Sequence, residues 1–263
     1  MPAFLDDISS FYGTGEKNGK GQTLEEFLEE YDPYKYKNPC ATTDAVVFSY
    51  AGEQELKKKK LKVLLVKRGN HPSIGYWALP GGFVNLKENL EQTARRELEE
   101  ETGVKDLPVE QFACLGAWNR DPRARVITTA YFSLVKEQDV KVHAGDDAAD
   151  AAWFQVTLEP AVSEETCNDA EKPEAPGEQK PGNEEEKRKK IRDLAEASEW
   201  AETEWILKLK NEEKGIETQA QIVKRMRLGL VRETYYEVKD GGMIAVDHAA
   251  ILAQALMILL KRI

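Results

Sequence analysis

The stretch that decides the fold is "LPGGFVNLKENLEQTARRELEEETGV", residues 79–104. Its Pro-Gly-Gly opening predicts a turn, and a helix is expected over about residues 88–102. Gly103 then stands where a left-handed helix cap belongs. A helix C-terminus carries partial negative charge, and like charges three or four residues apart repel by roughly 0.2–0.5 kcal/mol per pair. The last turns are nevertheless crowded with acid, at Glu97, Glu99, Glu100 and Glu101.

Three of these glutamates share one helix face. Glu97, Glu100 and Glu101 stand at positions i, i+3 and i+4, whereas Glu99 points elsewhere. Carboxylates grouped in this way are oxygen ligands for a hard divalent cation, and Mg²⁺ prefers a few carboxylates, some water and a substrate phosphate. Arg96, four residues before Glu100, is the expected ion-pair partner. The alternative for any glutamate-rich helix is a solvated acidic face without a ligand.

The spacing of these residues follows a longer pattern. Residues 82–104 read G-x5-E-x7-R-E-U-x-E-E-x-G-U, where U is a bulky aliphatic residue. This resembles the signature of the Nudix hydrolases at every specified position: Gly82, Glu88, Arg96, Glu97, Leu98, Glu100, Glu101, Gly103 and Val104. The resemblance implies an α/β protein, an α/β/α sandwich around a mixed sheet, in which the signature forms a loop–helix–loop.

The resemblance also implies a reaction. It is hydrolysis of the pyrophosphate bond in a nucleoside diphosphate linked to another moiety, with Mg²⁺ or Mn²⁺ as cofactor. Carried over by position, Glu97, Glu100 and Glu101 would hold the metal, and Glu100 or Glu97 would take a proton from the attacking water. Arg96 would orient the glutamates.

The loop before the helix is expected to complete the site. Glycines give the backbone freedom for close approach to a ligand. By resemblance, a backbone carbonyl at Gly81 or Gly82 would join the metal shell, and Gly81 and Glu88 would brace the loop.

Other stretches narrow the substrate. Residues 71–84, 119–135 and 244–256 resemble a branch that contains ADP-ribose pyrophosphatases and ADP-ribose-sensing Nudix regulators of NAD metabolism. The first interpretation is therefore hydrolysis of ADP-ribose to AMP and ribose 5-phosphate. The alternative is an ADP-ribose-sensing module without significant turnover. In such regulators a DNA-binding region follows the closing helix. This sequence ends at Ile263 and has a net charge of −10, so we expect a nucleotide partner and no nucleic acid.

Candidate substrate-binding residues follow from the same branch. Arg120, Arg123 and Arg125 lie between two predicted strands, and guanidinium groups suit bidentate contacts with a diphosphate. Since side chains alternate along a strand, Arg123 and Arg125 should point the same way. The alternative is a charged connecting loop. Trp77 is a candidate for stacking on adenine, with a core position as its alternative.

Four segments are expected along the chain. They are a polar N-terminal arm (1–38), the Nudix core (39–156), a flexible polar insertion (157–198), and a C-terminal hairpin with a closing helix (199–263). Apolar patterns predict strands at residues 41–51, 61–69, 109–118, 125–135, 150–156, 205–209 and 216–222. The closing helix should begin after Asp247, a residue suited to the N-cap.

Composition bounds the remaining properties. The 263 residues are 41% hydrophobic, enough for a core, and the three cysteines show no metal-type spacing. The N-terminus lacks the pattern of a signal peptide, and the most apolar segment, 249–260, is shorter than the roughly 20 residues that cross a bilayer. We therefore expect a cytoplasmic protein without a membrane partner. The family resemblance favours a homodimer.

Overall fold

A computed structural model describes residues 4–145, 148–161, 200–227 and 231–263. Most of the expected insertion, from residue 162 on, lies outside these described residues. The chain divides into two compact units, Met1–Pro39 and Cys40–Ile263.

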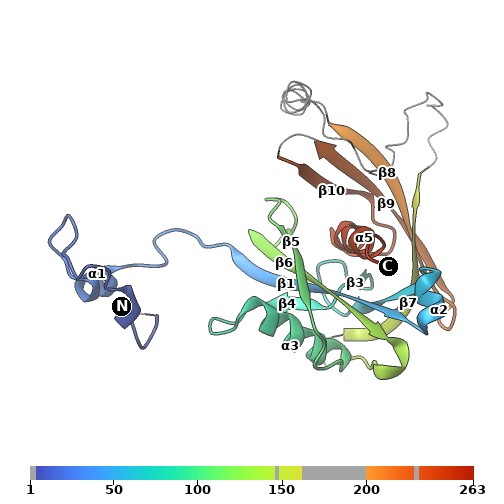
Figure 1. The fold of residues 1–263 in the computed structure, drawn as a ribbon, viewed down its shortest axis with the longest axis horizontal. Coiled ribbons are helices and arrows are strands. Elements are labelled where there is room, and N and C mark those ends of the chain that lie inside the picture. The colour runs from blue at the N-terminus through green and yellow to red at the C-terminus, as the bar shows by residue number, and fades with distance from the viewer. Residues whose placement is uncertain (1–3, 146–147, 162–199, 228–230) are drawn as a thin grey trace, which may run out of the picture. The chain divides into compact units, whose positions relative to one another are not determined.

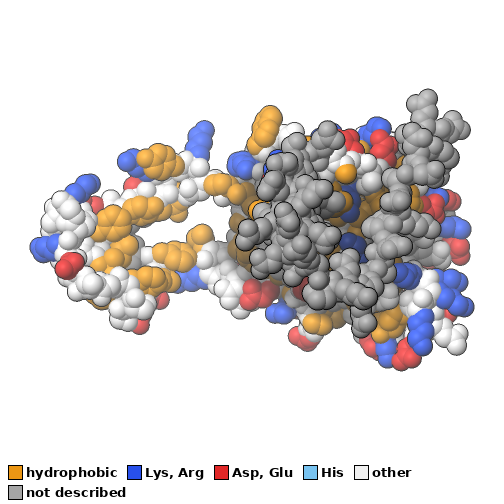
Figure 2. All heavy atoms as spheres, turned by 45° about the horizontal axis from the view of Figure 1, so that its top comes forward, with side chains coloured by type: hydrophobic (Ala, Val, Ile, Leu, Met, Phe, Trp, Pro, Cys, Tyr) orange, Lys and Arg blue, Asp and Glu red, His pale blue; other side chains and the backbone are white. Residues whose placement is uncertain are grey.

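The N-terminal unit contains the 3-10 turn η1 (Ser9–Phe11) and the helix α1 (Leu24–Glu30). Thr23 caps α1: its hydroxyl accepts from the Glu26 amide at 3.3 Å, and the Glu26 carboxylate accepts from the Thr23 amide at 2.8 Å. No described residue of this unit is buried. Hydrophobic side chains gather on its surface (Figure 2, left), so the unit has no core of its own.

The second unit is built on a ten-stranded mixed sheet, as the sequence predicts. The order is β10-β9-β8-β7-β2-β1-β6-β5, with β3 paired to β2 and β4 to β1. The β1–β6 pair is parallel over its whole length, from Cys40↔Val126 to Tyr50↔Lys136. The strands are β1 Cys40–Tyr50, β2 Leu61–Arg68, β3 Trp77–Ala78, β4 Gly81–Phe83, β5 Glu110–Leu115, β6 Val126–Lys136, β7 Ala148–Pro160, β8 Ala201–Asn211, β9 Ile216–Arg227 and β10 Glu233–Asp240.

Helices cover both faces of this sheet (Figure 1). The helix α3 (Leu90–Thr102) packs on one face, and α5 (His248–Leu259) lies within the curl of the other. Smaller elements are α2 (Glu53–Lys57) and the 3-10 turn η2 (Glu137–Asp139). The α5 sequence is apolar on all sides because strands surround it, which is what a fully buried helix requires.

The central strand β1 explains why the two layers hold together. Val46 and Phe48 belong to the core around α5, whereas Val47, on the other face, belongs to the core under α3. A strand buried on both faces reads as a continuous apolar run, as residues 45–48 do. Neighbouring residues of one strand therefore build two separate cores.

The C-terminal hairpin agrees with the sequence and is longer than expected. β8 and β9 pair antiparallel down to Asn211↔Ile216, with the turn between them at residues 212–215. The extra length of the two strands was not predicted, because charged residues on their outward face interrupt the apolar pattern. The strand β10, "ETYYEVKD", was not predicted, because an edge strand with so many polar residues carries little apolar alternation. Within the described part of the chain, no helix combines the length and hydropathy needed to span a bilayer.

Candidate active site

Two glycines allow the strand β4 to approach both β1 and the acidic helix. Asp44 and Thr43 of β1 pair with Gly81 and Gly82. A Cβ atom on Gly81 would collide with the carbonyl of Thr43, and one on Gly82 would collide with the carboxylate of Glu97. The Gly81 amide donates to Glu101 Oε2 at 3.0 Å. The backbone of β1 therefore excludes a side chain at Gly81, whereas a side chain at Gly82 would displace the Glu97 carboxylate. The Gly81 bond ties the loop directly to the acid face.

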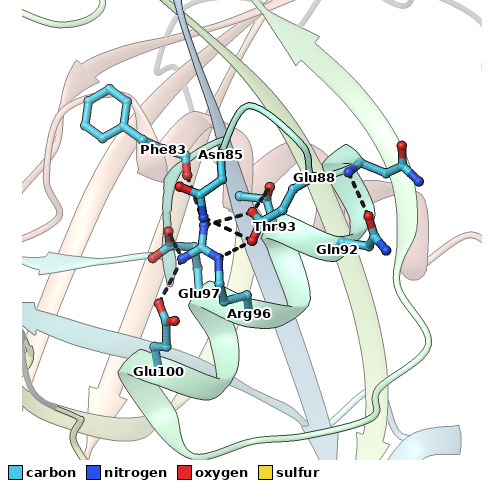
Figure 3. A network of polar contacts seen from close by, with 9 residues as sticks. Phe83, Asn85, Glu88, Gln92, Thr93, Arg96, Glu97 and Glu100 are labelled. Carbon is cyan, nitrogen blue, oxygen red and sulfur yellow. Dashed lines mark hydrogen bonds and ion pairs between the residues drawn. The ribbon is translucent and has the colours of Figure 1, made fainter. Parts of the chain in front are cut away.

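Arg96 is the centre of a polar network that joins this loop to the helix (Figure 3). Its Nε donates to Glu88 Oε1 at 2.8 Å, and its Nη1 donates to Glu97 Oε1 at 2.6 Å and to Glu100 Oε2 at 2.8 Å. Its Nη2 donates to the carbonyl of Phe83 at 3.0 Å. One guanidinium thus contacts three of the signature carboxylates and the loop backbone.

Glu88 binds the same guanidinium from the loop side. It also accepts from the Thr93 hydroxyl at 2.8 Å and from the Asn85 amide at 3.0 Å. These donors, above all Arg96, lower the pKa of Glu88 to about 2. Because Glu88 is engaged in this way, the helix begins two residues later than expected, with Asn89 as its N-cap.

The end of the helix agrees with its sequence. Gly103 adopts the left-handed conformation, with φ at 72°, and its amide bonds the carbonyl of Glu99 at 2.8 Å. The side chain of Glu99 points away from the acid face and pairs with Lys105. Glu99, which was predicted to lie outside the site, therefore forms its ion pair away from the acid face.

The three carboxylates of the acid face differ in their surroundings. Burial raises the pKa of Glu101 to about 7, and the nearby charges of Glu97 and Asp44 add to that rise. Burial also raises the pKa of Glu97. Glu100 is different, because its side chain is 57% exposed and does not line the pocket. Two partly buried carboxylates that line one pocket oppose each other's ionisation, and a cation between them would remove that cost.

The residues on this wall of the pocket fit a divalent cation that would lie between Glu97 and Glu101. Glu97 and Glu101 supply oxygen ligands on one pocket wall, and Gly82 leaves backbone open beside Glu97. Among the described residues, no three acidic, histidine or cysteine side chains already form a complete metal cluster. In this structure the Arg96 guanidinium supplies the positive charge next to Glu97 and Glu100.

These residues line a cavity of about 520 Å³. Its walls come from β1, the end of β2, β4, α3, the loop before β6 and the start of α5. Acidic and basic side chains both line it, among them Asp44, Glu97, Glu101, Arg68, Arg96, Arg120 and Arg123. The volume and the mixture of charges suit a polar ligand of nucleotide size.

Arg120 lies on the pocket wall in a partly buried ion pair. Its side chain is 7% exposed. Its Nε donates to Asp247 Oδ2 at 2.9 Å, and its Nη2 donates to Asp247 Oδ1 at 3.0 Å. The same Nη2 lies 3.7 Å from Oδ2 of Asp44. Asp247 is the N-cap of α5 but makes no side-chain capping bond, because its carboxylate binds Arg120.

The other two predicted arginines are not placed as strand geometry suggested. β6 begins at Val126, so Arg123 and Arg125 both lie on the preceding loop, and the expected alternation does not apply. Arg123 lines the pocket, forms a two-bond pair with Asp121 and lies 5.5 Å from the ring centre of Phe83. Arg125 is not part of the pocket wall and donates to the carbonyl of Ala117 at 3.0 Å.

Trp77 requires a correction. It is 1% exposed and packs edge-on against Phe154, with ring centres 4.7 Å apart. It belongs to the core around α5 and does not line the pocket, so it offers no face for stacking on adenine. A tryptophan in a two-residue strand next to a buried helix serves packing here.

Three pocket residues were not foreseen. Asp44 is a 6% exposed carboxylate within an apolar strand, and its Oδ2 accepts from the Thr128 hydroxyl at 2.7 Å. The Nδ1 atom of His248 accepts a hydrogen bond from the Leu79 amide at 2.8 Å. Arg68 is the last residue of β2 and lines the pocket. A buried charge in an apolar run is unusual, and at Asp44 that signal could have been used.

Comparisons with known proteins agree with the signature. The model of the NUDIX domain matches residues 43–171. The chain is 40% identical over 111 residues to the ADPR responsive transcriptional repressor NtrR of Acinetobacter baylyi, covering 41% of this chain and 42% of the repressor. It is 34% identical over 128 residues to the ADP-ribose pyrophosphatase of Methanocaldococcus jannaschii, covering 49% and 69% of the two chains.

A solved structure extends the likeness beyond the signature. The MutT/nudix family protein from Enterococcus faecalis matches with a TM-score of 0.57 and 26% identity, over 91% of this chain and 70% of that one. The similarity therefore extends well beyond residues 43–171.

Proposed function

This chain belongs to the Nudix family, and from that membership we propose that it hydrolyses the pyrophosphate bond of a nucleoside diphosphate linked to another moiety. ADP-ribose, cleaved to AMP and ribose 5-phosphate, is the best candidate substrate. The carrying observation is the acid face itself. Glu97 and Glu101 line one pocket, next to a glycine loop that approaches them without a side chain.

The acid face would hold the cofactor, Mg²⁺ or Mn²⁺, through Glu97, Glu101, Glu100 and the backbone carbonyl of Gly82. Once bound, the cation would neutralise the anionic diphosphate and acidify the attacking water. Arg96 would keep Glu97 and Glu100 oriented, since its guanidinium bonds both.

A proton must leave the attacking water, and either Glu97 or Glu100 would accept it. Glu97 has the better position because it lines the pocket, whereas Glu100 faces solvent. A general base must come within hydrogen-bond reach of the proton that it removes. Glu88 would act indirectly, by holding Arg96 through a 2.8 Å bond.

Substrate recognition would involve Arg123, which lies on the pocket wall beside the ring of Phe83. An arginine there suits a contact with the diphosphate or the terminal ribose. Arg120 would shape the pocket by holding Asp247.

A panel of nucleotides, incubated with Mg²⁺ and read by mass spectrometry, tests the proposal. ADP-ribose should give AMP and ribose 5-phosphate faster than diadenosine polyphosphates, nucleoside triphosphates or NADH are cleaved. Preference for one of those, with ADP-ribose ignored, would end the ADP-ribose assignment and leave the pyrophosphate chemistry intact.

A second candidate is an ADP-ribose-sensing module without significant turnover. The 40% identity to a repressor described as ADPR responsive favours it. The complete set of signature carboxylates favours the enzyme. Binding of ADP-ribose without its cleavage in Mg²⁺ or Mn²⁺ would select the sensor.

We also propose a homodimer, because the N-terminal unit exposes large hydrophobic side chains and buries none of its described residues. A second copy would give that surface a partner. Light scattering during size-exclusion chromatography measures the mass directly. The cytoplasmic location expected from the cysteine pattern is tested by cell fractionation.

A further inference from the structure

The glycine loop, residues 79–82, is held by side chains from two helices. On one side, the Gly81 amide donates to Glu101 Oε2 of α3 at 3.0 Å. On the other side, the Leu79 amide donates to Nδ1 of His248, the first residue of α5, at 2.8 Å. A single residue separates the two amides along the chain. The place of the loop beside the acid face therefore depends on α5 as well as on α3.

The bond to Leu79 defines which nitrogen of His248 carries a proton. An imidazole nitrogen that accepts a hydrogen bond has no proton of its own, so the proton of the neutral ring is on Nε2. Nε2 lies 3.8 Å from Oδ1 of Asp44. The other carboxylate oxygen of Asp44 accepts from the Thr128 hydroxyl at 2.7 Å. Each nitrogen of the ring thus faces a group of the protein, and this sets the orientation of the ring.

Burial makes the acceptor at His248 hard to replace. Leu79 is 2% exposed, and the side chain of His248 is 12% exposed. A buried amide that loses its acceptor destabilises the arrangement that contains it. Without the imidazole, the glycine loop would therefore shift until the Leu79 amide found another acceptor or water.

Other backbone bonds limit how far the loop could move. Upstream of it, the Trp77 amide donates to the carbonyl of Met243 at 2.9 Å, and the Trp77 carbonyl accepts from the Ala245 amide at 2.8 Å. Within the loop, the Pro80 carbonyl accepts from the Ala45 amide of β1 at 2.8 Å. These bonds do not involve a side chain of α5. Loss of the imidazole would thus displace the loop without detaching it from the sheet.

The start of α5 is suited to act as the fixed support. Most of the helix is buried in the larger core. Its N-cap residue, Asp247, makes two bonds to Arg120 directly before His248. A group carried by a rigid, packed helix holds its partner more precisely than a group on a loop does.

We propose that His248 is a positioning residue of the metal site, which holds the glycine loop against the acid face through the Leu79 amide. His248 acts through the loop and is not itself a ligand. The assignment of a divalent cation to the acid face rests on the proposed function, whereas the link from α5 to the loop rests on the bonds of Leu79 and Gly81.

Binding of Mn²⁺ alone to the full chain tests this role, with the free ion measured by electron paramagnetic resonance. His248→Leu has a similar size and no acceptor. His248→Asn keeps an acceptor near the place of Nδ1, whereas His248→Gln carries it one bond farther from the backbone. Mn²⁺ affinity should fall about 10-fold in His248→Leu and His248→Gln, as for a group that holds a metal ligand, and recover in His248→Asn.

Amide hydrogen exchange, followed by NMR without metal, gives a second readout. The Leu79 and Gly81 amides should both lose protection in His248→Leu, although His248 bonds only the first of them. The amide of Val47, within the buried part of β1, should exchange as in the wild type. This comparison separates a local shift of the loop from a general loss of stability.

His71→Leu is the matched control. His71 is an exposed histidine that lines the same pocket, and within the described residues its side chain makes no hydrogen bond. Its Mn²⁺ affinity and its amide exchange at Gly81 should equal those of the wild type. Thermal melting identifies any variant that fails to fold, and His248→Gln carries the comparison if His248→Leu does.

Four results would overturn the positioning role. They are unchanged Mn²⁺ affinity in His248→Leu and His248→Gln, an equal loss in His248→Asn, unchanged exchange of the Gly81 amide in His248→Leu, and no Mn²⁺ binding by the wild type. Failure of the proposed function looks different. In that case no nucleotide is cleaved, yet Mn²⁺ affinity still follows the acceptor at position 248.

Discussion

Arg120 and Asp247 form a two-bond ion pair across the pocket, with N···O distances of 2.9 and 3.0 Å between residues 127 positions apart. The pair joins the loop before β6 to Asp247, the N-cap residue of α5. It therefore ties the wall of the candidate active site to the helix around which the larger core is packed. A pocket built in this way depends on its charges for stability as well as for binding.

Removing that pair should destabilise the protein. Arg120→Ala would leave Asp247 and the buried Asp44 without their cation, and because the pair is only partly buried we expect a loss of at most about 3 kcal/mol, the lower end for a fully buried pair. Urea unfolding measures it. Arg262→Ala is the control, because Arg262 also makes two bonds to a distant carboxylate, that of Glu110, but on the exposed surface. Equal effects of the two changes would mean that burial of the Arg120 pair contributes nothing.

Neutralising the acid face should abolish turnover and leave the fold intact. Glu101→Gln and Glu100→Gln each keep the shape and remove the charge. We expect at least about a 100-fold fall in kcat with Mg²⁺, in line with the loss of a catalytic metal ligand. Glu99→Gln, outside the pocket and paired with Lys105, should keep normal activity. Near-normal turnover of both Glu101→Gln and Glu100→Gln would mean that the acid face is only solvated surface.

The stability of the metal-free protein should fall as the pH rises. The pKa of Glu101 is about 7 in the folded state, whereas its ordinary value is 4.5. Between these values the folded state holds a proton that the unfolded state has released, so the contribution of Glu101 is greatest below pH 4.5, decreases as the pH rises toward 7, and levels off above it. Glu97 adds in the same direction.

Thermal melting in a chelator, from pH 5 to pH 8, measures this slope. Glu101→Gln should flatten it and raise the melting temperature at pH 8, because the glutamine has no proton to release. Glu99→Gln should keep the wild-type slope. A melting curve of Glu101→Gln that is as steep as that of the wild type would assign the effect to other groups.

Glu88 should act in the opposite direction. Its pKa of about 2 lies below the ordinary 4.5, so its contribution to stability is present above pH 4.5 and is lost as the pH falls toward 2. Glu88→Gln should therefore be less stable than the wild type at pH 7, and the difference should shrink in acid. Urea unfolding at several pH values gives the comparison. A constant difference across that range would show that the charge of Glu88 is unimportant.

Arg123→Ala should affect substrate binding more than chemistry. A contact made equally in the ground state and the transition state changes KM and leaves kcat nearly constant. We expect KM for ADP-ribose to rise about 10-fold, the lower end for a charge-assisted contact, because Asp121 already shares the guanidinium. Arg225→Ala, which removes another carboxylate-paired arginine from β9, should leave KM unchanged. An effect on kcat alone would contradict a binding role.

The features that the sequence predicted well are local ones. The helix that brings Glu97 and Glu101 to the pocket follows from its residue spacing, although Glu100, expected on the same face, does not line the pocket. The helix end follows from Gly103, whose φ of 72° suits glycine. Strands β1, β2 and β6 were found because apolar runs mark them. Each of these signals lies within about one helix turn or one strand, so no knowledge of packing is needed.

The predictions that failed depended on the surroundings of a residue. Trp77 was a candidate for stacking, but neighbours from distant strands bury it. The expected shared direction of Arg123 and Arg125 assumed a strand that begins only at Val126. β10 carries too few apolar residues to be seen, and it forms because the partner strand β9 is present.

By itself, the sequence determined the Nudix signature, the acidic helix and most of the strands, because helical spacing, capping and apolar patterns act between near neighbours; the mixed sheet was implied by the family resemblance. Only the tertiary structure decided which charges meet. It brings Asp44, Arg68 and Asp247 to one cavity from segments far apart in the chain. It also pairs Arg120 and Arg123 with carboxylates, since ion pairing depends on distances of a few ångströms that packing sets and local sequence does not.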